Sequence, residues 1–385
     1  MRRRSLRALG LDAVPFRHPL EYPGRPAPEP CLLLETELLP LRAVPGRPLG
    51  AWPVVGGGAA AGTDGSGAGS RTEDGSGPPP DDGGEPRTKH GSGPPADRGP
   101  GTEDGSGPPV DDGGGLRKDR TGMAVAGRSG ANAVPGGGGP AGDAGPTPDA
   151  VPGGAEVRDG TEPPLDTLLT ALGRLVTGRR HPVLAVGSNA SPAQMCHKLA
   201  AHGLPATVPM VPVTVRGIGV GCSAHIGRAG YVAAAPYADP AAERRLVVSW
   251  LDPDQLAAVD ASELHYRRVL LPGAAFPMTL PSGDPLGGAY LYVSRHGVLL
   301  DPATGRPHPG AEDQSALLSA LLRSSKRLRT LLGPDPHAWT ERARAEEAVR
   351  AEGARIFREE GWIHPEGDLP SGSGTTDLRH ADLAP

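Results

Sequence analysis

The pattern of apolar and polar residues predicts strands in the middle of the second half of the chain and helices on either side of them. Apolar residues recur at helical spacing from Leu165 to Val176, directly after two prolines, which is typical of an amphipathic helix. Further helices are expected at 191–201, 252–266, 317–332 and 340–357. Apolar runs, some interrupted by glycines, predict strands at 183–186, 211–226, 231–237, 244–251, 267–271 and 287–294. This order favours an α+β fold in which helices surround a small mixed β-barrel.

Bulky apolar residues nearly disappear between Gly56 and about Gly160. The chain contains 58 glycines and 46 prolines, a content typical of chains with long low-complexity segments. Within this stretch "TEDGSGPPPDDGG" at 72–84 recurs as "TEDGSGPPVDDGG" at 102–114, and the repeat has no apolar face that a neighbouring repeat could bury. We interpret it as an expanded low-complexity tract, because burial cannot offset the entropy of ordering such a backbone.

The apolar content divides the chain into six segments. We expect a disordered N-terminus at 1–15, a short strand segment at 16–55, a low-complexity disordered insert at 56–160, a main domain at 161–300, a helical extension at 301–365 and a disordered tail at 366–385. The strand segment contains "CLLLETELLPLR" and is too short to hold a core of its own. We therefore expect it to pack on the main domain across the insert.

Charge and composition argue against two classes of partner. A net charge of -5 gives no global basic field for binding nucleic acid. No run approaches the roughly 20 apolar residues that span a bilayer, and Asp12 and Pro15 interrupt the apolar stretch that follows the N-terminal arginines. The cysteines, Cys31, Cys196 and Cys222, are odd in number and lack CxxC spacing, and the histidines from His181 to His296 lack the spacing of metal ligands. We expect a cytoplasmic protein with no nucleic-acid partner, no membrane partner and no metal site.

Gly187-Ser188-Asn189 follows a strand and precedes a helix. The residues permit two interpretations, which the local sequence leaves open. Ser188, Asn189 or Ser191 can cap the helix, with Pro192 in its first turn. Alternatively, successive backbone amides at this point can hold an anion or a polarised carbonyl oxygen. A serine-hydrolase elbow is poorly supported, because Gly187 is adjacent to Ser188 rather than two residues away.

Glu263 lies at helical spacing from Leu256, Val259 and Tyr266, which places an acid close to an apolar helix face. Burying it there is costly. Either it finds a cationic or amide partner, for which Arg267 and Arg268 are the nearest cations in the sequence, or it lies in a cleft as a general base.

Together these two stretches resemble one family. "AVGSNAS" at 185–191 is similar to the "YGSN" loop of γ-glutamylcyclotransferases, and "VDASELHYRRVLL" at 259–271 is similar to their "LDxxEGxxYRRxxV" segment. The resemblance covers about 183–294. Two positions depart from it, since Val186 replaces the family's Tyr and Leu264 replaces its Gly.

The resemblance implies a small mixed barrel and an enzyme that releases 5-oxoproline from a γ-glutamyl amide or peptide, with the substrate's own α-amine as the attacking group. It implies that Glu263 is the acid–base residue. It implies that the γ-glutamyl group is held by Val183, Leu184, Ala185, Val186, Gly187, Ser188, Asn189 and Tyr266. Such a cyclisation requires no cofactor or metal ion. The alternative is an inactive binding or scaffold protein on the same fold, whose helical tail contacts a protein partner.

Overall fold

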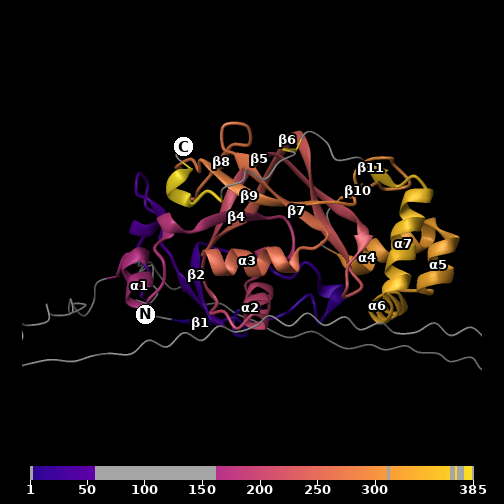
Figure 1. Cartoon of the computed structure of the whole chain (residues 1–385), viewed down its shortest axis with the longest axis horizontal. Helices are drawn as coiled ribbons and strands as arrows, with labels where there is room; N and C mark the ends of the chain where they lie inside the picture. Colours follow the sequence, from indigo (N-terminus) through magenta and orange to yellow (C-terminus); the bar gives the residue numbers. More distant parts are fainter. Residues whose placement is uncertain (1–2, 57–161, 310–312, 365–368, 371–376, 384–385) are drawn as a thin grey trace, which may run out of the picture. The chain divides into compact units, whose positions relative to one another are not determined.

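A mixed β-sheet forms the centre of the computed structural model, which describes residues 3–56, 162–309, 313–364, 369–370 and 377–383 (Figure 1). Its strands are β1 (Arg4–Ser5), β2 (Cys31–Leu34), β3 (Glu37–Pro40), β4 (His181–Ala185), β5 (Thr207–Ile226), β6 (Val232–Leu251), β7 (Tyr266–Pro272), β8 (Met278–Thr279), β9 (Gly288–Ser294), β10 (Val298–Leu299) and β11 (Ile363–His364). The α-helices of the described ranges are α1 (Leu165–Ala171), α2 (Pro192–Ala201), α3 (Pro253–Ser262), α4 (Gln314–Ser324), α5 (Lys326–Leu332), α6 (Pro336–Ala345) and α7 (Glu347–Glu359). The mixed α+β class and the helical C-terminal part are confirmed.

The sheet is open, so the prediction of a β-barrel is wrong. The strand order is β1-β3-β2-β5-β6-β4-β9-β7, with β8, β10 and β11 attached beside this path. Closing a barrel requires the two end strands to pair, whereas the described β1 pairs only with β3, and β7 only with β9. Side chains of β7 instead contact residues near the C-terminus: Arg267 Nη1 donates to the Pro370 carbonyl at 2.7 Å, and Arg268 forms an ion pair with Asp377 at 2.8 Å.

The hairpin of β5 and β6 is longer than the sequence predicts. Each strand has 20 residues, and β6 joins two strands that were expected separately at 231–237 and 244–251. Glu243 pairs with Arg216 and Ala238 pairs with Ile218, so residues 239–242 lie at a register shift opposite Gly217, and the register shifts again between Cys222 and Ile226. These irregularities bend a hairpin that would otherwise run straight.

Residues on both sides of 57–161 belong to one compact unit. β2 pairs with β5 through Leu33 and Val208, and Trp52 is fully buried in the same apolar cluster as Leu165 and Leu169. The backbone is hydrogen bonded across the two flanks: Val54 N–H donates to the Pro163 carbonyl, and Leu165 N–H donates to the Trp52 carbonyl, both at 2.9 Å. The predicted insert at 56–160 lies outside the described residues apart from Gly56.

Both ends of the chain differ from the expected disorder where they are described. In 3–15, Leu6 and Leu11 are buried and β1 pairs with β3, because even these scattered leucines reach the core. In the tail, the His380 N–H donates to the Arg180 carbonyl at 2.7 Å within 377–383. The remaining residues of 366–385, apart from 369–370, lie outside the described ranges.

Helices α4 to α7 gather beside one end of the sheet (Figure 1). Their apolar residues share a buried cluster with β5 and β6, in which Leu321, Trp339 and Phe357 pack with Ile226 and Val232. Two helices were expected here. Four form, because Ser325 Oγ caps α5 by accepting a hydrogen bond from the Leu328 N–H and the chain breaks again at Glu346. In the described part of the chain, no helix has the length and apolar character needed to cross a bilayer.

Candidate active site

The chain turns sharply after β4. Residues Ser188–Ala190 form a single 3-10 turn, after which Ser191 caps α2 by accepting a 3.5 Å hydrogen bond from Gln194 N, with Pro192 in the first helical turn. Of the three cap candidates the structure selects Ser191. The side chains of Ser188 and Asn189 therefore do not cap α2 and can make other contacts. The first backbone N–H groups of the 3-10 turn have no hydrogen-bond partner within the turn.

Gly187 is required by space. Its φ of -138° is accessible to any residue, but a Cβ atom there would overlap the Tyr22 hydroxyl and lie 3.1 Å from the Ala234 side chain. Tyr22 comes from the N-terminal segment and Ala234 from β6. The glycine therefore lets a phenol from the N-terminal segment lie directly against the turn.

Glu263 is positioned by the end of α3. The helix starts with a capping box, in which Asp252 Oδ1 accepts from Gln255 N at 2.9 Å and Gln255 Oε1 accepts from Asp252 N at 3.1 Å. It ends at Ser262, so Glu263 is the C-cap rather than part of the apolar helix face. The helix predicted at 252–266 therefore ends four residues earlier than expected. Leu264, which follows the C-cap, is 78% exposed.

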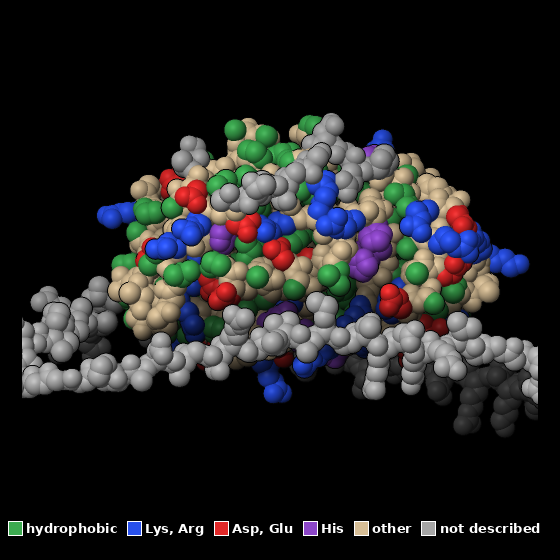
Figure 2. Space-filling view, viewed as in Figure 1, with side chains coloured by type: hydrophobic (Ala, Val, Ile, Leu, Met, Phe, Trp, Pro, Cys, Tyr) green, Lys and Arg blue, Asp and Glu red, His purple; other side chains and the backbone are tan. Residues whose placement is uncertain are grey.

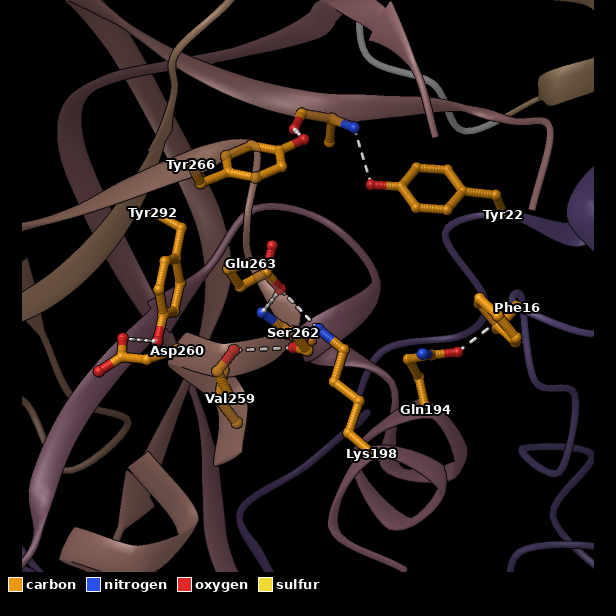
Figure 3. A network of polar contacts seen from close by, with 12 residues as sticks. Phe16, Tyr22, Gln194, Lys198, Val259, Asp260, Ser262, Glu263, Tyr266 and Tyr292 are labelled. Carbon is orange, nitrogen blue, oxygen red and sulfur yellow. Dashed lines mark hydrogen bonds and ion pairs between the residues drawn. The ribbon is translucent and has the colours of Figure 1, made fainter. Parts of the chain in front are cut away.

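The Glu263 carboxylate has both a cationic and an amide partner (Figure 3). Glu263 Oε1 accepts from Lys198 Nζ at 2.5 Å and from Asn189 Nδ2 at 2.9 Å, while Lys198 Nζ also donates to Asn189 Oδ1 at 2.7 Å. The Lys198 and Glu263 side chains are 12% and 14% exposed. Both hydrogen bonds end on Oε1, and Oε2 has no hydrogen-bond partner among the described residues. Oε2 is therefore available to a ligand.

The prediction that Arg267 or Arg268 is the cationic partner of Glu263 is wrong. Arg268 instead pairs with Asp260 at 2.9 Å and with Asp377, and Arg267 bonds to the Pro370 carbonyl. In β7 both arginines lie beyond Tyr266 and their side chains reach the C-terminal residues, whereas Lys198 reaches Glu263 from α2.

A cavity of about 1080 Å³ opens in front of this network. The predicted residues that line it are Leu184, Ala185, Val186, Gly187, Ser188, Asn189, Glu263 and Tyr266. Val183 is the exception: it is buried in a core cluster with Tyr290, its neighbour on β9. The turn after β4 and the acid after α3 thus meet at one cavity wall.

Four of the chain's six tyrosines also line the cavity: Tyr22, Tyr231, Tyr266 and Tyr292. The Tyr22 oxygen accepts from Ala234 N at 2.7 Å and Tyr266 Oη donates to Ala234 O at 2.9 Å, so the two phenols hold the same residue of β6 from two sides (Figure 3). Burial raises the pKa of both phenols well above the usual value, and both therefore stay protonated. The Tyr22 hydroxyl hydrogen has no acceptor among the described residues.

Sequence reasoning missed Lys198 and Tyr22. Lys198 had a weak signal, as a lysine in the helix that follows the Gly-Ser-Asn stretch. The signal for Tyr22 was its residue type: aromatic residues make up only 3% of the chain, so each tyrosine is a candidate site residue. Neither signal shows where the side chain points.

Another part of the cavity wall carries histidines and arginines. His225, His265 and His296 form a cluster with ring centroids 4.5 to 5.1 Å apart, and Ser223 Oγ lies 2.6 Å from His225 Nδ1. Burial, followed by the charges of the other two rings, lowers the pKa of His225 well below its usual value. In the described ranges no group of His, Cys, Asp or Glu side chains is arranged to hold a metal ion.

Two arginines of α7, Arg350 and Arg358, line the cavity beside this histidine cluster. Burial first, and then Arg350, lowers the pKa of His265. Burial, His265 and Arg358 lower that of His296. In Figure 2 histidine side chains lie on the surface next to the helical C-terminal part, with Lys and Arg side chains nearby.

Several solved structures are similar to this chain. A γ-glutamyl cyclotransferase is 12% identical, over 46% of this chain and 98% of that one, with a TM-score of 0.26. A yeast γ-glutamyl cyclotransferase specific to glutathione is 12% identical, over 43% and 98%, with a TM-score of 0.23. An Arabidopsis thaliana protein solved in solution is 18% identical, over 40% and 89%, with a TM-score of 0.25. No protein-family model matches the chain, and no curated protein matches it.

Proposed function

We propose that the chain is an enzyme that cyclises a γ-glutamyl amide or peptide to 5-oxoproline and releases the amine. One observation carries the proposal: Glu263 is fixed through Oε1 by Lys198 and Asn189 while its Oε2 is left available at the wall of a large cavity. A residue that both takes and returns a proton must be held in place and still be accessible.

The reaction moves one proton through Glu263. Oε2 accepts a proton from the substrate's α-ammonium, and the free amine attacks the γ-carbonyl carbon. A C–N bond of the five-membered ring forms, and the carbonyl oxygen takes up negative charge. Glu263 then returns the proton to the leaving nitrogen as the γ-amide C–N bond breaks. The ring nitrogen, which still carries two hydrogens, gives one of them to the released amine, which leaves as an ammonium ion, and no water is consumed.

The developing oxyanion faces donors from two parts of the chain. The turn at Gly187–Asn189 presents backbone N–H groups, and the protonated Tyr22 hydroxyl lies against Gly187 with its hydrogen available. Donors held in place before the reaction stabilise the tetrahedral intermediate without reorganisation. Tyr22 also places a phenol next to the turn, where Val186 leaves the stretch without the Tyr of the family's loop.

The test is 5-oxoproline release from a panel of γ-glutamyl peptides and γ-glutamyl amines. We expect Glu263→Gln to lower kcat by at least about 100-fold, the usual scale of general acid–base catalysis. Glu243→Gln is the matched control, because that carboxylate forms an exposed ion pair with Arg216 away from the cavity. Equal turnover by wild type and Glu263→Gln would remove Glu263 from the mechanism.

A binding or scaffold protein on this fold is the competing proposal. It predicts that γ-glutamyl compounds bind without release of 5-oxoproline from any member of the panel. A protein partner for the helices of 301–365 stays a prediction, as does the cytoplasmic location.

A further inference from the structure

We propose that the C-terminal segment 377–383 is a positioning element of the candidate active site. It acts through a chain of ion pairs, formed by Asp377, Arg268 and Asp260, that ends in the last turn of α3. The inference rests on the proposed function and deepens it by naming residues that orient the acid–base group without touching the substrate. None of the described residues that line the cavity belongs to this segment.

Asp260 connects the acid–base group to the cavity wall. It lies in the last turn of α3, and its backbone carbonyl accepts from Glu263 N at 3.1 Å. Its side-chain Oδ1 accepts from the hydroxyl of Tyr292, a residue of the cavity wall, at 2.7 Å (Figure 3). Burial first, and then the charge of Asp260, raises the pKa of Tyr292, so the phenol stays protonated and donates. A movement of Asp260 would therefore disturb both the backbone at Glu263 and the wall at Tyr292.

Arg268 holds Asp260 from outside the cavity. From β7 its Nε donates to Asp260 Oδ1 at 2.9 Å, and its Nη1 donates to Asp377 Oδ1 at 2.8 Å. The guanidinium carbon lies 4.6 Å from the centre of the Tyr290 ring, and the side chain is 14% exposed. Because a guanidinium is planar and its donors are fixed relative to one another, an acceptor on Nη1 sets the direction of Nε. Asp377 therefore determines how Arg268 meets Asp260.

The segment 377–383 is held against the sheet through its backbone. Leu378 N donates to Tyr290 Oη at 2.6 Å, and the Leu378 carbonyl accepts from His181 Nδ1 at 2.8 Å. A carbonyl oxygen only accepts, so this nitrogen of the buried imidazole carries a hydrogen. His380 N donates to the Arg180 carbonyl at 2.7 Å, directly before β4. Contacts with β4 and β9 thus fix the path of the segment.

Two side chains anchor the far end of the segment. His380 packs edge-on against Trp250 of β6, with ring centroids 5.7 Å apart and ring planes at 89°. Leu383 is buried and lies beside Gly288, where a Cβ would come 3.6 Å from Leu383 Cδ2. With its backbone and its far end anchored, the segment presents the Asp377 carboxylate to Arg268 at a fixed place.

The first experiment removes the charge of Asp377. Asp377→Asn should lower kcat for 5-oxoproline release by about tenfold with little change in KM, because a slightly misplaced catalytic group slows the chemical step. Asp377→Glu, which keeps the charge, should recover most of the rate. The melting temperature should stay close to that of wild type, since the Asp377 side chain is 48% exposed and such ion pairs contribute little to stability.

The matched control is Glu29→Gln. Glu29 forms an ion pair with Arg4 at 3.1 Å, its side chain is 49% exposed, and neither residue lines the cavity. This variant should keep the wild-type kcat. A kcat of Asp377→Asn equal to that of wild type, or a loss no larger than that of Glu29→Gln, would contradict the positioning role.

A double-variant cycle tests the path through Asp260. If Asp377 acts through that residue, adding Asp377→Asn to Asp260→Asn should lower kcat by less than about twofold further. Tyr292→Phe combined with Asp377→Asn provides the same test where Asp260→Asn fails to fold. Effects that multiply in both cycles would show that the segment does not act along this path and would overturn it.

Amide hydrogen exchange separates this inference from the proposed function, because it needs no turnover. Exchange at 260–266 should be faster by about threefold in Asp377→Asn than in wild type or Glu29→Gln, whereas exchange in α2 should not change. If no γ-glutamyl compound is converted yet this difference is seen, the proposed function fails and the positioning role stands. Unchanged exchange at 260–266 in Asp377→Asn would overturn the inference at any level of activity.

Discussion

Lys198 Nζ lies 2.5 Å from Glu263 Oε1, in an ion pair whose two side chains are 12% and 14% exposed. Because the two side chains are so little exposed, each charge has lost much of its favourable hydration. The attraction between the two charges offsets most of that loss in free energy. Asn189 connects to both members and ties the end of α3 to the turn after β4. The same three residues thus hold the backbone together and orient the proposed acid–base group.

Removing either charge should destabilise the fold. We expect Lys198→Met to lower the free energy of unfolding by about 3 kcal/mol, because it leaves a largely buried carboxylate without its cation. Glu263→Gln should also lower the free energy of unfolding. The loss in the double variant should be smaller than the sum of the two single losses, by about 1 to 3 kcal/mol. Urea unfolding of all four proteins measures this coupling.

The control for that cycle is the ion pair of Arg216 and Glu243, whose side chains are 70% and 54% exposed. Its coupling should be below about 1 kcal/mol. A coupling at Lys198 and Glu263 no larger than this would contradict the structural role of the pair.

A methyl group at Gly187 should be tolerated only if Tyr22 loses its hydroxyl. Gly187→Ala should destabilise by about 1 to 3 kcal/mol through overlap with Tyr22 Oη. Tyr22→Phe alone should cost about 1 kcal/mol, because Ala234 N loses its acceptor. If the overlap is the cause, the double variant should be more stable than Gly187→Ala alone in thermal unfolding. Gly178→Ala, whose new Cβ would make an ordinary 3.6 Å contact with Ala381, should change little.

Stability should fall in mild acid because of His225. Its pKa is lowered in the folded state, so the unfolded chain binds the proton more readily. The stability that the neutral ring contributes is present above the unfolded pKa of about 6.5 and is lost as the pH falls below it toward the folded value. The charged and titratable groups around the ring are His265, His296, Tyr266 and the arginines of α7.

Melting temperature measured from about pH 7 to about pH 5 tests this. His225→Asn should show a shallower decline than wild type, with part of the decline retained because the pKa values of His265 and His296 are lowered too. The exposed His337 supplies the control, since His337→Asn should keep the wild-type slope. Parallel curves for wild type and His225→Asn would be the contrary result.

The segment 57–161 should be replaceable by a short linker. Val54 and Leu165 are hydrogen bonded to the opposite flank, so the chain leaves and re-enters the described fold at one point. We expect a chain with Gly56 joined to Glu162 through a few Gly and Ser residues to melt at a temperature close to that of wild type. Loss of folding in that chain would show that 57–161 contributes to stability.

The sequence predicts most of the elements that frame the site, because their signals are local. The strand before Gly187, the capped start of α2 and the start of α3 at Asp252-Pro253 all follow from short-range patterns. The open sheet could not be predicted in this way. The strand order joins segments that are far apart in the sequence, and the register shifts of β5 and β6 involve both strands at once.

The partners of Glu263 were missed for a related reason. Arg267 and Arg268 are near it in sequence, but β7 carries them away, while Lys198 is 65 positions distant and reaches it from another helix. Arg350 and Arg358 occur in a stretch rich in Arg and Glu, which is typical of a solvated helix surface. Only the contact of α7 with β5 shows that one of its faces borders a cavity.

The bond between Tyr22 and Ala234 joins residues 212 positions apart, and α7 adds a wall from a third region of the chain. Contacts of such long range require large loops to close, which costs entropy and slows folding. The cavity wall includes residues from both the N-terminal segment and the C-terminal helix α7. A ligand that fills the cavity would therefore bind the finished fold alone, and its binding energy would favour completion over every partly assembled form.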